Sequence, residues 1–290
     1  MYMNQMTSIK IINHNNILFK SKQTLQVFIT TLLSLLLPLS FLLLARISTA
    51  SYLLSRNLEF PVSEPASTVF FSLLSSIPFT PLHVLVSVLC VASLINALNS
   101  DGRTGFHIFG SPETSGKEQL YTAWIVLCTL QVCVGLGIEG SIGVGIEGSS
   151  FSHDRNMICR LVFFLGLHTT TVYWWRTIVK PVVDDTMFGF EMEERLVERV
   201  VMGASLGGLW WWRLRDEVEA LAAVTELKRE VGAGVGVVDL MSWWLYYLVV
   251  TIGIVRVMKW LVWCGLVLLY QKVEQDRGDN NGSLDVEEKV

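Results

Sequence analysis

The chain has 290 residues, of which 22 are Lys or Arg and 26 are Asp or Glu, and its mean hydropathy is +0.47. Only 17% of the residues are charged, against about a quarter in soluble domains. This composition excludes a disordered chain, and the net charge of −4 excludes a nucleic-acid-binding protein. Charged residues are missing from positions 23–45, 65–100 and 119–138. Such stretches predict an all-α, polytopic helical membrane protein with five or six transmembrane helices.

The first apolar segment, residues 25–45, predicts a retained membrane-spanning helix. As a helix it spans about 31 Å, the thickness of the hydrocarbon core. It follows a basic, polar leader (residues 1–24) and ends before Arg46. A cleaved signal peptide is the alternative, but its apolar core is typically about 7–15 residues long. A transit peptide is disfavoured because the leader is rich in Asn rather than in Arg and Ser.

Two prolines, Pro78 and Pro81, divide the second apolar stretch. The later half, residues 81–98, is long enough to span the bilayer. The earlier half, residues 66–77, is short, and we interpret it as an interfacial or half-inserted segment; a hairpin of two short helices is the alternative.

Further spans are predicted near residues 120–138, 158–178, 195–212 and 240–260. Tryptophans lie beside charged residues at several of these ends: Trp174 and Trp175 precede Arg176, and Trp210, Trp211 and Trp212 precede Arg213. Indoles in these positions are typical of the headgroup layer. The segment 195–212 contains only 13 consecutive uncharged residues (200–212), and hydropathy is nearly neutral on whether it crosses, which leaves five or six crossings as alternatives.

The distribution of Lys and Arg predicts a cytosolic N-terminus. Six crossings place 11 of these residues on the N-terminal side and 8 on the other. If residues 195–212 do not cross, the numbers become 13 and 7, so the positive-inside rule favours five crossings.

Residues 213–230 predict an amphipathic surface helix. Its apolar residues recur at steps of three or four, and Arg213–Glu217 and Arg215–Glu219 are predicted ion pairs on its polar side. We expect the chain to bend near Arg213 and this helix to lie on the membrane surface, with Glu219 and Glu226 in water and Leu221 in lipid. The membrane domain then ends near residue 271, and an acidic, disordered tail follows (residues 272–290).

Two glycine patterns invite functional interpretations. Residues 135–149 repeat a GxGxxG motif, but the strand that a dinucleotide site requires is not expected before it, so we interpret the region as a flexible exit loop. Gly203 and Gly207 form a GxxxG step, which permits close helix packing in lipid.

Charged and polar residues within spans are the remaining candidates. Arg256 and Lys259, like Glu198 and Arg199, either mark a solute path or snorkel to the headgroups, and snorkelling is the simpler interpretation. His83 and His168 are expected to hydrogen-bond within the bundle, without a metal. Asn281 lies in a glycosylation sequon that is usable only if the tail is lumenal. No cofactor is expected.

Two short segments, PLSFLLLAR (residues 38–46) and DGRTGFHIFG (residues 101–110), resemble stretches in multi-pass membrane proteins of flowering plants whose activity is unknown. The resemblance implies a small helical protein of the endomembrane system; the plasma membrane is the other expected location. It transfers no site residue.

Function is predicted only by class. The leading hypothesis is a non-catalytic multi-pass protein that acts by packing with helices, lipids or partner proteins, with the lipid bilayer as its expected partner and no nucleic acid. The alternatives are a small-solute or ion transporter using Arg256 and Lys259, and a membrane-embedded enzyme using His168 with Glu198.

Overall fold

The computed structural model describes residues 20–55, 80–99, 116–143, 157–188, 196–232 and 234–284, and the regular structure within these ranges is helical. The predicted all-α fold is confirmed. Five helices are long and apolar enough to cross a membrane: Lys20–Leu53, Thr80–Leu98, Leu120–Gly143, Met157–Thr186 and Val237–Lys272. Outside the described residues lie most of the leader, the segment 66–77, the loop 101–110, the second glycine copy (144–149) and the end of the tail.

The first span consists of a helical stretch over residues 20–34 followed by α2 (Leu36–Ser55). Leu35 joins the two, since its N–H donates to Thr31 and its carbonyl accepts from Leu39. Pro38 has no N–H to continue this series. In the same turn, the indole N–H of Trp174 donates to the carbonyl of Leu33 at 3.1 Å, which attaches the fourth span to the first next to the proline.

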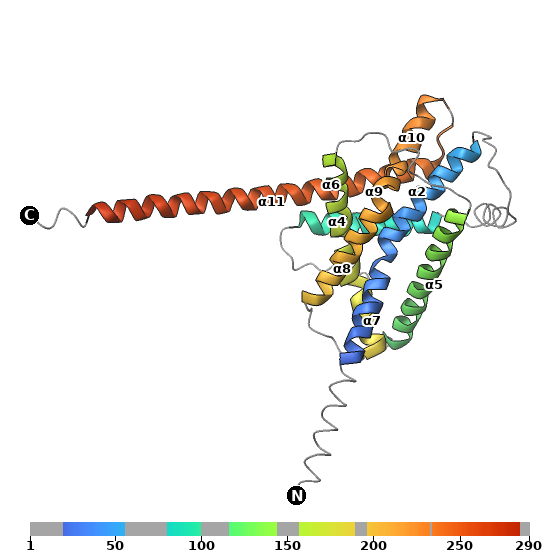
Figure 1. Cartoon of the computed structure of the whole chain (residues 1–290), viewed down its shortest axis with the longest axis horizontal. Helices are drawn as coiled ribbons and strands as arrows, with labels where there is room; N and C mark the ends of the chain where they lie inside the picture. Colours follow the sequence, from blue (N-terminus) through green and yellow to red (C-terminus); the bar gives the residue numbers. More distant parts are fainter. Residues whose placement is uncertain are drawn as a thin grey trace, which may run out of the picture.

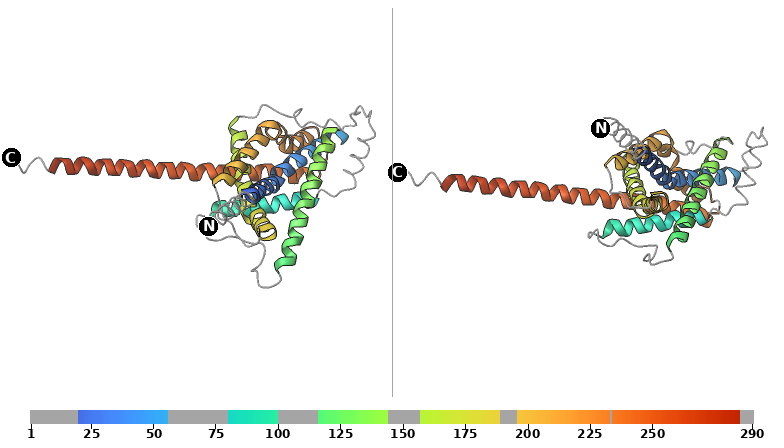
Figure 2. Two further views of the ribbon diagram at one scale, coloured as in Figure 1. Left: turned by 60° about the horizontal axis from the view of Figure 1, so that its bottom comes forward. Right: turned by 90° about the horizontal axis from the view of Figure 1, so that it is seen from below.

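The remaining spans surround α2. The second is α4 (Thr80–Leu98), the third α5 (Gly116–Gly143), and the fourth begins as α6 (Met157–Trp174) and continues through η2 (Trp175–Val179), α7 (Lys180–Val183) and η3 (Asp184–Phe188). Figure 1 shows α2, α5 and α6 along the long direction of the bundle, while α4 and α11 (Val237–Leu284) run across it. The turned views in Figure 2 show the same crosswise course of α4 and α11.

The crossing of α6 and α11 depends on two glycines. A Cβ on Gly166 would lie 2.0 Å from the carbonyl oxygen of Val249, and a Cβ on Gly253 would lie 2.0 Å from that of Val162. Only glycine allows two helix backbones to approach this closely. Aromatic rings fill the space beside the crossing, with Phe163 stacked on Tyr246 at a centroid distance of 5.0 Å.

Two of the tryptophans predicted at the membrane interface lie in the core instead. Trp174 and Trp175 are each only 2% exposed, because the fourth span continues past them through η2 and α7. Trp211 and Trp212 are 72% and 68% exposed, as an interfacial position requires.

The third and fifth spans extend beyond the predicted ends. α5 continues to Gly143, so the first glycine copy is helical and the prediction of a flexible loop is wrong there. Val134 and Ser141 of this stretch are buried, and their packing offsets the weak helix propensity of glycine. α11 continues to Leu284, so residues 272–284 are helical rather than disordered. Extending an existing helix adds a hydrogen bond per residue without a new nucleation step.

The predicted span 195–212 is not among the five long apolar helices. It contains α8 (Leu196–Leu209) and the first residues of η4 (Trp210–Leu214), followed by α9 (Arg215–Glu217) and α10 (Ala220–Glu230). By length and composition, five of the described helices could therefore cross a membrane, which is the number favoured by the positive-inside rule.

The chain between Asp184 and Glu217 nevertheless links two distant positions of the first span. The side-chain amide of Gln26, near the start of the first span, donates to Asp184, whereas Glu217 accepts from Arg46 of the same span. Twenty helical residues separate Gln26 from Arg46, a distance of about 30 Å. Figure 1 shows α9 beside the middle of α2.

This course predicts that Asp185 and Glu230, both exposed, face opposite sides of the membrane. In a variant without the five native cysteines, Asp185→Cys and Glu230→Cys are expected to react with a membrane-impermeant maleimide from opposite sides of sealed vesicles. Labelling of both from one side would contradict the prediction and show that residues 196–217 return without crossing.

Candidate functional site

Charged side chains gather beside the middle of α2, where α5 ends and α6 and α11 begin. The centre of the cluster is a buried ion pair between Arg46 of α2 and Glu217 of α9, with exposed fractions of 2% and 1%. The Nε and Nη2 groups of Arg46 donate to the two carboxylate oxygens of Glu217 at 2.5 and 2.7 Å. This bidentate arrangement is the strongest geometry available to the two groups.

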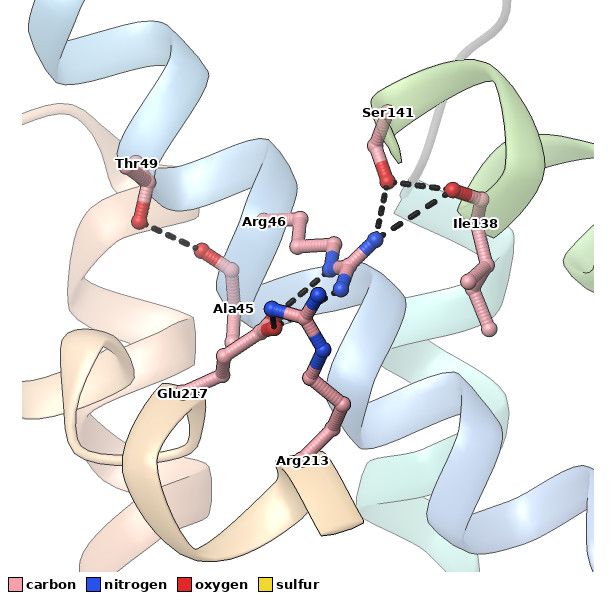
Figure 3. A network of polar contacts seen from close by, with 7 residues as sticks. All are labelled: Ala45, Arg46, Thr49, Ile138, Ser141, Arg213 and Glu217. Atoms are coloured by element: carbon pink, nitrogen blue, oxygen red, sulfur yellow. Dashed lines mark hydrogen bonds and ion pairs between the residues drawn. The ribbon is translucent and has the colours of Figure 1, made fainter. Parts of the chain in front are cut away.

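Further donors and acceptors surround this pair (Figure 3). Nη1 of Arg46 donates to Ser141 Oγ at 2.8 Å and to the carbonyl of Ile138 at 3.3 Å, so the same guanidinium also holds α5. Arg213 reaches Glu217 at 3.5 Å from the more exposed side. Two guanidinium groups therefore neutralise one buried carboxylate.

A second ion pair joins the segment after α9 to α6. Nε of Arg160 donates to Glu219 at 2.6 Å, and Arg160 also lies 3.7 Å from Asp216. Glu219 is 4% exposed, whereas Arg160 is 21% exposed, so this pair lies nearer the surface than the Arg46–Glu217 pair.

A third ion pair joins α10 to the start of α11. Nζ of Lys228 donates to both carboxylate oxygens of Asp239 at 2.8 Å. Asp239 also accepts from the N–H of Gly236, which caps the first turn of α11. The hydroxyl of Thr225 donates to the main-chain carbonyl of Asp239 at 3.0 Å.

The three ion pairs together attach residues 213–230 to α2, α6 and α11. Each buried carboxylate already faces a cation at hydrogen-bonding distance, so its charge is neutralised within the protein. Buried pairs contribute little net stability but disfavour arrangements that separate the partners. The role of this cluster is therefore structural, because its ion pairs fix the positions of the helices that they join.

The sequence-based interpretation of residues 213–230 was partly wrong. The apolar stripe is present, but Leu221 is fully buried, and α10 packs on α2 and α11 rather than on lipid. Glu219 is buried against Arg160 rather than hydrated, while Glu226 is exposed and accepts from the hydroxyl of Tyr247 at 3.2 Å. A hydrophobic stripe has the same period whether it faces lipid or protein, so its pattern did not distinguish the two.

The predicted ion pairs within this helix have mixed outcomes. The Arg213–Glu217 pair is confirmed. Arg215 pairs with its neighbour Asp216 at 3.1 Å and lies over the Trp211 ring at 5.0 Å, instead of reaching Glu219. Arg46, interpreted as the end of the first span, is a central residue of the cluster; the only sequence signal was a single arginine continuing an apolar helix.

The structure shows no close helix contact at the GxxxG step among the residues that it describes, and its role in packing stays a prediction. A Cβ added to Gly203 or Gly207 would meet nothing there within 4 Å, so the two glycines do not bring a described helix close. The close approach is instead at Gly166 and Gly253, which the sequence places in different helices and which therefore form no local motif.

The other predicted residues lie in different surroundings. Glu198 is buried in α8 and Arg199 is exposed. Arg256 and Lys259 are exposed on α11, beyond its crossing with α6, and neither forms an ion pair with a described residue. Asn281 lies in the last turns of α11, and its use as a glycosylation site stays a prediction.

The predicted hydrogen bond of His83 is confirmed. Its Nε2 lies 3.1 Å from Ser242 Oγ, linking α4 to α11 in a buried position. His168 is half-buried in α6 against the ring of Phe164, with centroids 6.4 Å apart.

Beyond the crossing, α11 leaves the bundle. Residues 254–272, which we name the distal segment, project away from the other helices (Figures 1 and 2). Its large apolar side chains are exposed, among them Trp260 at 67%, Leu266 at 60% and Tyr270 at 71%. The segment is 19 residues long, or about 28 Å as a helix, close to the thickness of a hydrocarbon core.

Comparisons with known proteins identify no relative. No family model matches the chain, and neither the curated proteins nor the solved structures include a match.

Proposed function

We propose that this chain is a non-catalytic multi-pass membrane protein whose bundle presents the distal segment of α11 for packing against another membrane helix. The exposure of this segment carries the proposal: α11 packs on α4 and α6, whereas the large apolar side chains of its distal segment are exposed and the segment projects away from the bundle (Figures 1 and 2). The ion pairs around Lys228 and Asp239 hold the start of α11 in place.

The transporter alternative has less support. A solute path would require Arg256 and Lys259 to face the interior of the bundle. Both side chains are exposed instead of lying in the interior of the bundle. The enzyme alternative requires His168 beside Glu198, and no contact between them supports a shared site.

The proposal includes an orientation and a location. The excess of Lys and Arg on the N-terminal side supports a cytosolic N-terminus. The resemblance to membrane proteins of flowering plants supports the endomembrane system, with the plasma membrane as the alternative.

Photo-crosslinking in native membranes tests this function. A photoreactive residue at Val262 or Leu269, both exposed, is expected to give one discrete product larger than the 32.6 kDa chain. The same residue at Leu221, which is fully buried, is the matched control and is expected to react only within the chain. If the distal positions yield lipid adducts alone, the segment contacts no partner and the proposed function is wrong.

A further inference from the structure

The distal segment has two chemically different faces. Positions 256, 260, 263, 267 and 270 recur at steps of four and three and therefore share one side of the helix. This side carries cationic and aromatic residues, and we name it the aromatic-basic face: Arg256, Lys259, Trp260, Trp263, Val267 and Tyr270. The opposite side is aliphatic, with Leu261, Val262, Leu268 and Leu269 all about as exposed as the aromatic side chains.

Arg256 and Lys259 lack the carboxylate partner that the buried cations of the bundle have. Arg46 and Lys228 each face a carboxylate at 2.8 Å or less. Arg256 and Lys259 face none among the described residues.

The length of α11 makes these cations difficult to leave unpaired. Residues 240–271 form an uninterrupted apolar helix apart from Arg256 and Lys259, and its length is about 48 Å. Keeping the whole helix within a core of about 30 Å would require a tilt of about 50°, and both cations would then lie inside the hydrocarbon. If Arg256 and Lys259 instead lie in one headgroup layer, the apolar residues of α11 on the far side of the two cations are left in water.

We propose that the aromatic-basic face binds a membrane helix that carries a carboxylate, with the Asp or Glu of that helix opposite Arg256 and Lys259. Charge complementarity identifies this occupant, because a cation inside the bilayer is normally paired with an acid. A parallel second copy does not satisfy the requirement: residues 240–271 contain no Asp or Glu, so two α11 helices would set cation against cation. The inference rests on the proposed function and specifies its partner.

A designed peptide tests the assignment directly. The full-length chain is placed as single copies in phosphatidylcholine nanodiscs with a labelled Leu/Ala transmembrane peptide that has one Asp at mid-depth, or Leu at the same position. Energy transfer between chain and peptide is expected to show about tenfold tighter association with the Asp peptide, the size of an interhelical polar contact in membranes. The double variant Arg256→Gln/Lys259→Gln is expected to lose this preference.

The control variant carries changes on the opposite side, Leu261→Ala and Leu268→Ala, and is expected to keep the preference for Asp. Equal association of both peptides, or an undiminished preference in the Gln variant, would overturn the assignment. Loss of the energy transfer when anionic lipid is added would also overturn it. Self-association of α11 that depends on Arg256 and Lys259 would do the same.

The two proposals fail separately. A partner crosslink at Val262 that persists in the Gln variant would refute the carboxylate partner and leave the proposed function standing. If the chain with Arg256 and Lys259 intact forms no crosslink to a partner at Val262 or Leu269, the proposed function itself is refuted.

Discussion

Replacing Arg46 by Met is expected to destabilise the folded protein by about 3–5 kcal/mol, because it leaves the carboxylate of Glu217 buried without its bidentate partner. Glu217 is 1% exposed, so water cannot replace the lost donors without opening the contact between α2 and α9. The change also frees Ser141 and thereby weakens the attachment of α5. Thermal unfolding in detergent, followed by circular dichroism, measures the effect.

Two control variants separate the charge from the loss of side-chain volume. Arg213→Gln removes the outer cation, which is 31% exposed and 3.5 Å from Glu217, and is expected to cost less than Arg46→Met. The double variant Arg46→Met/Glu217→Leu removes both buried charges and is expected to recover most of the lost stability. If the double variant were as unstable as Arg46→Met, packing rather than the unpaired carboxylate would explain the loss.

Gly253→Ala is expected to break the crossing of α6 and α11. The added methyl group would lie 2.0 Å from the backbone carbonyl oxygen of Val162, and a backbone atom cannot move aside as a flexible side chain can. The helices must separate, which costs at least the 1–3 kcal/mol or so of an overpacked core. Gly166→Ala is expected to act in the same way against Val249. Cysteine crosslinking between the two helices would measure their separation.

Three other helical glycines provide matched controls: Gly203, Gly207 and Gly265. A Cβ on any of them meets no described atom within 4 Å. Alanine at these positions is expected to leave the fold intact or to stabilise it by up to about 1 kcal/mol, since alanine has the higher helix propensity. Comparable losses at Gly253 and Gly203 would contradict the close crossing.

The residue pattern was enough to predict the fold class and most of the spans, because the bilayer makes the same demand on every spanning segment by itself. Each spanning helix must pair its own backbone polar groups and present apolar side chains along its length, so the hydropathy of a segment predicts whether it spans. Residues 25–45, 81–98 and 120–138 illustrate this: the structure places a span over each of them. The ends were less predictable, since whether a helix continues past Trp175 or past Arg46 depends on what it meets there.

Contacts between distant residues were decided by the tertiary structure alone. Arg46 and Glu217 are 171 positions apart, and nothing local in either segment shows that the two charges neutralise each other. The stripe of α10 has the same period for lipid as for protein, and Gly166 and Gly253 form a motif only after two helices cross. The amino-acid order thus determined which segments are apolar and helical, because those properties depend on neighbours in the chain. Which charges pair, which glycines touch and which half of α11 stays outside the bundle depended on packing in three dimensions.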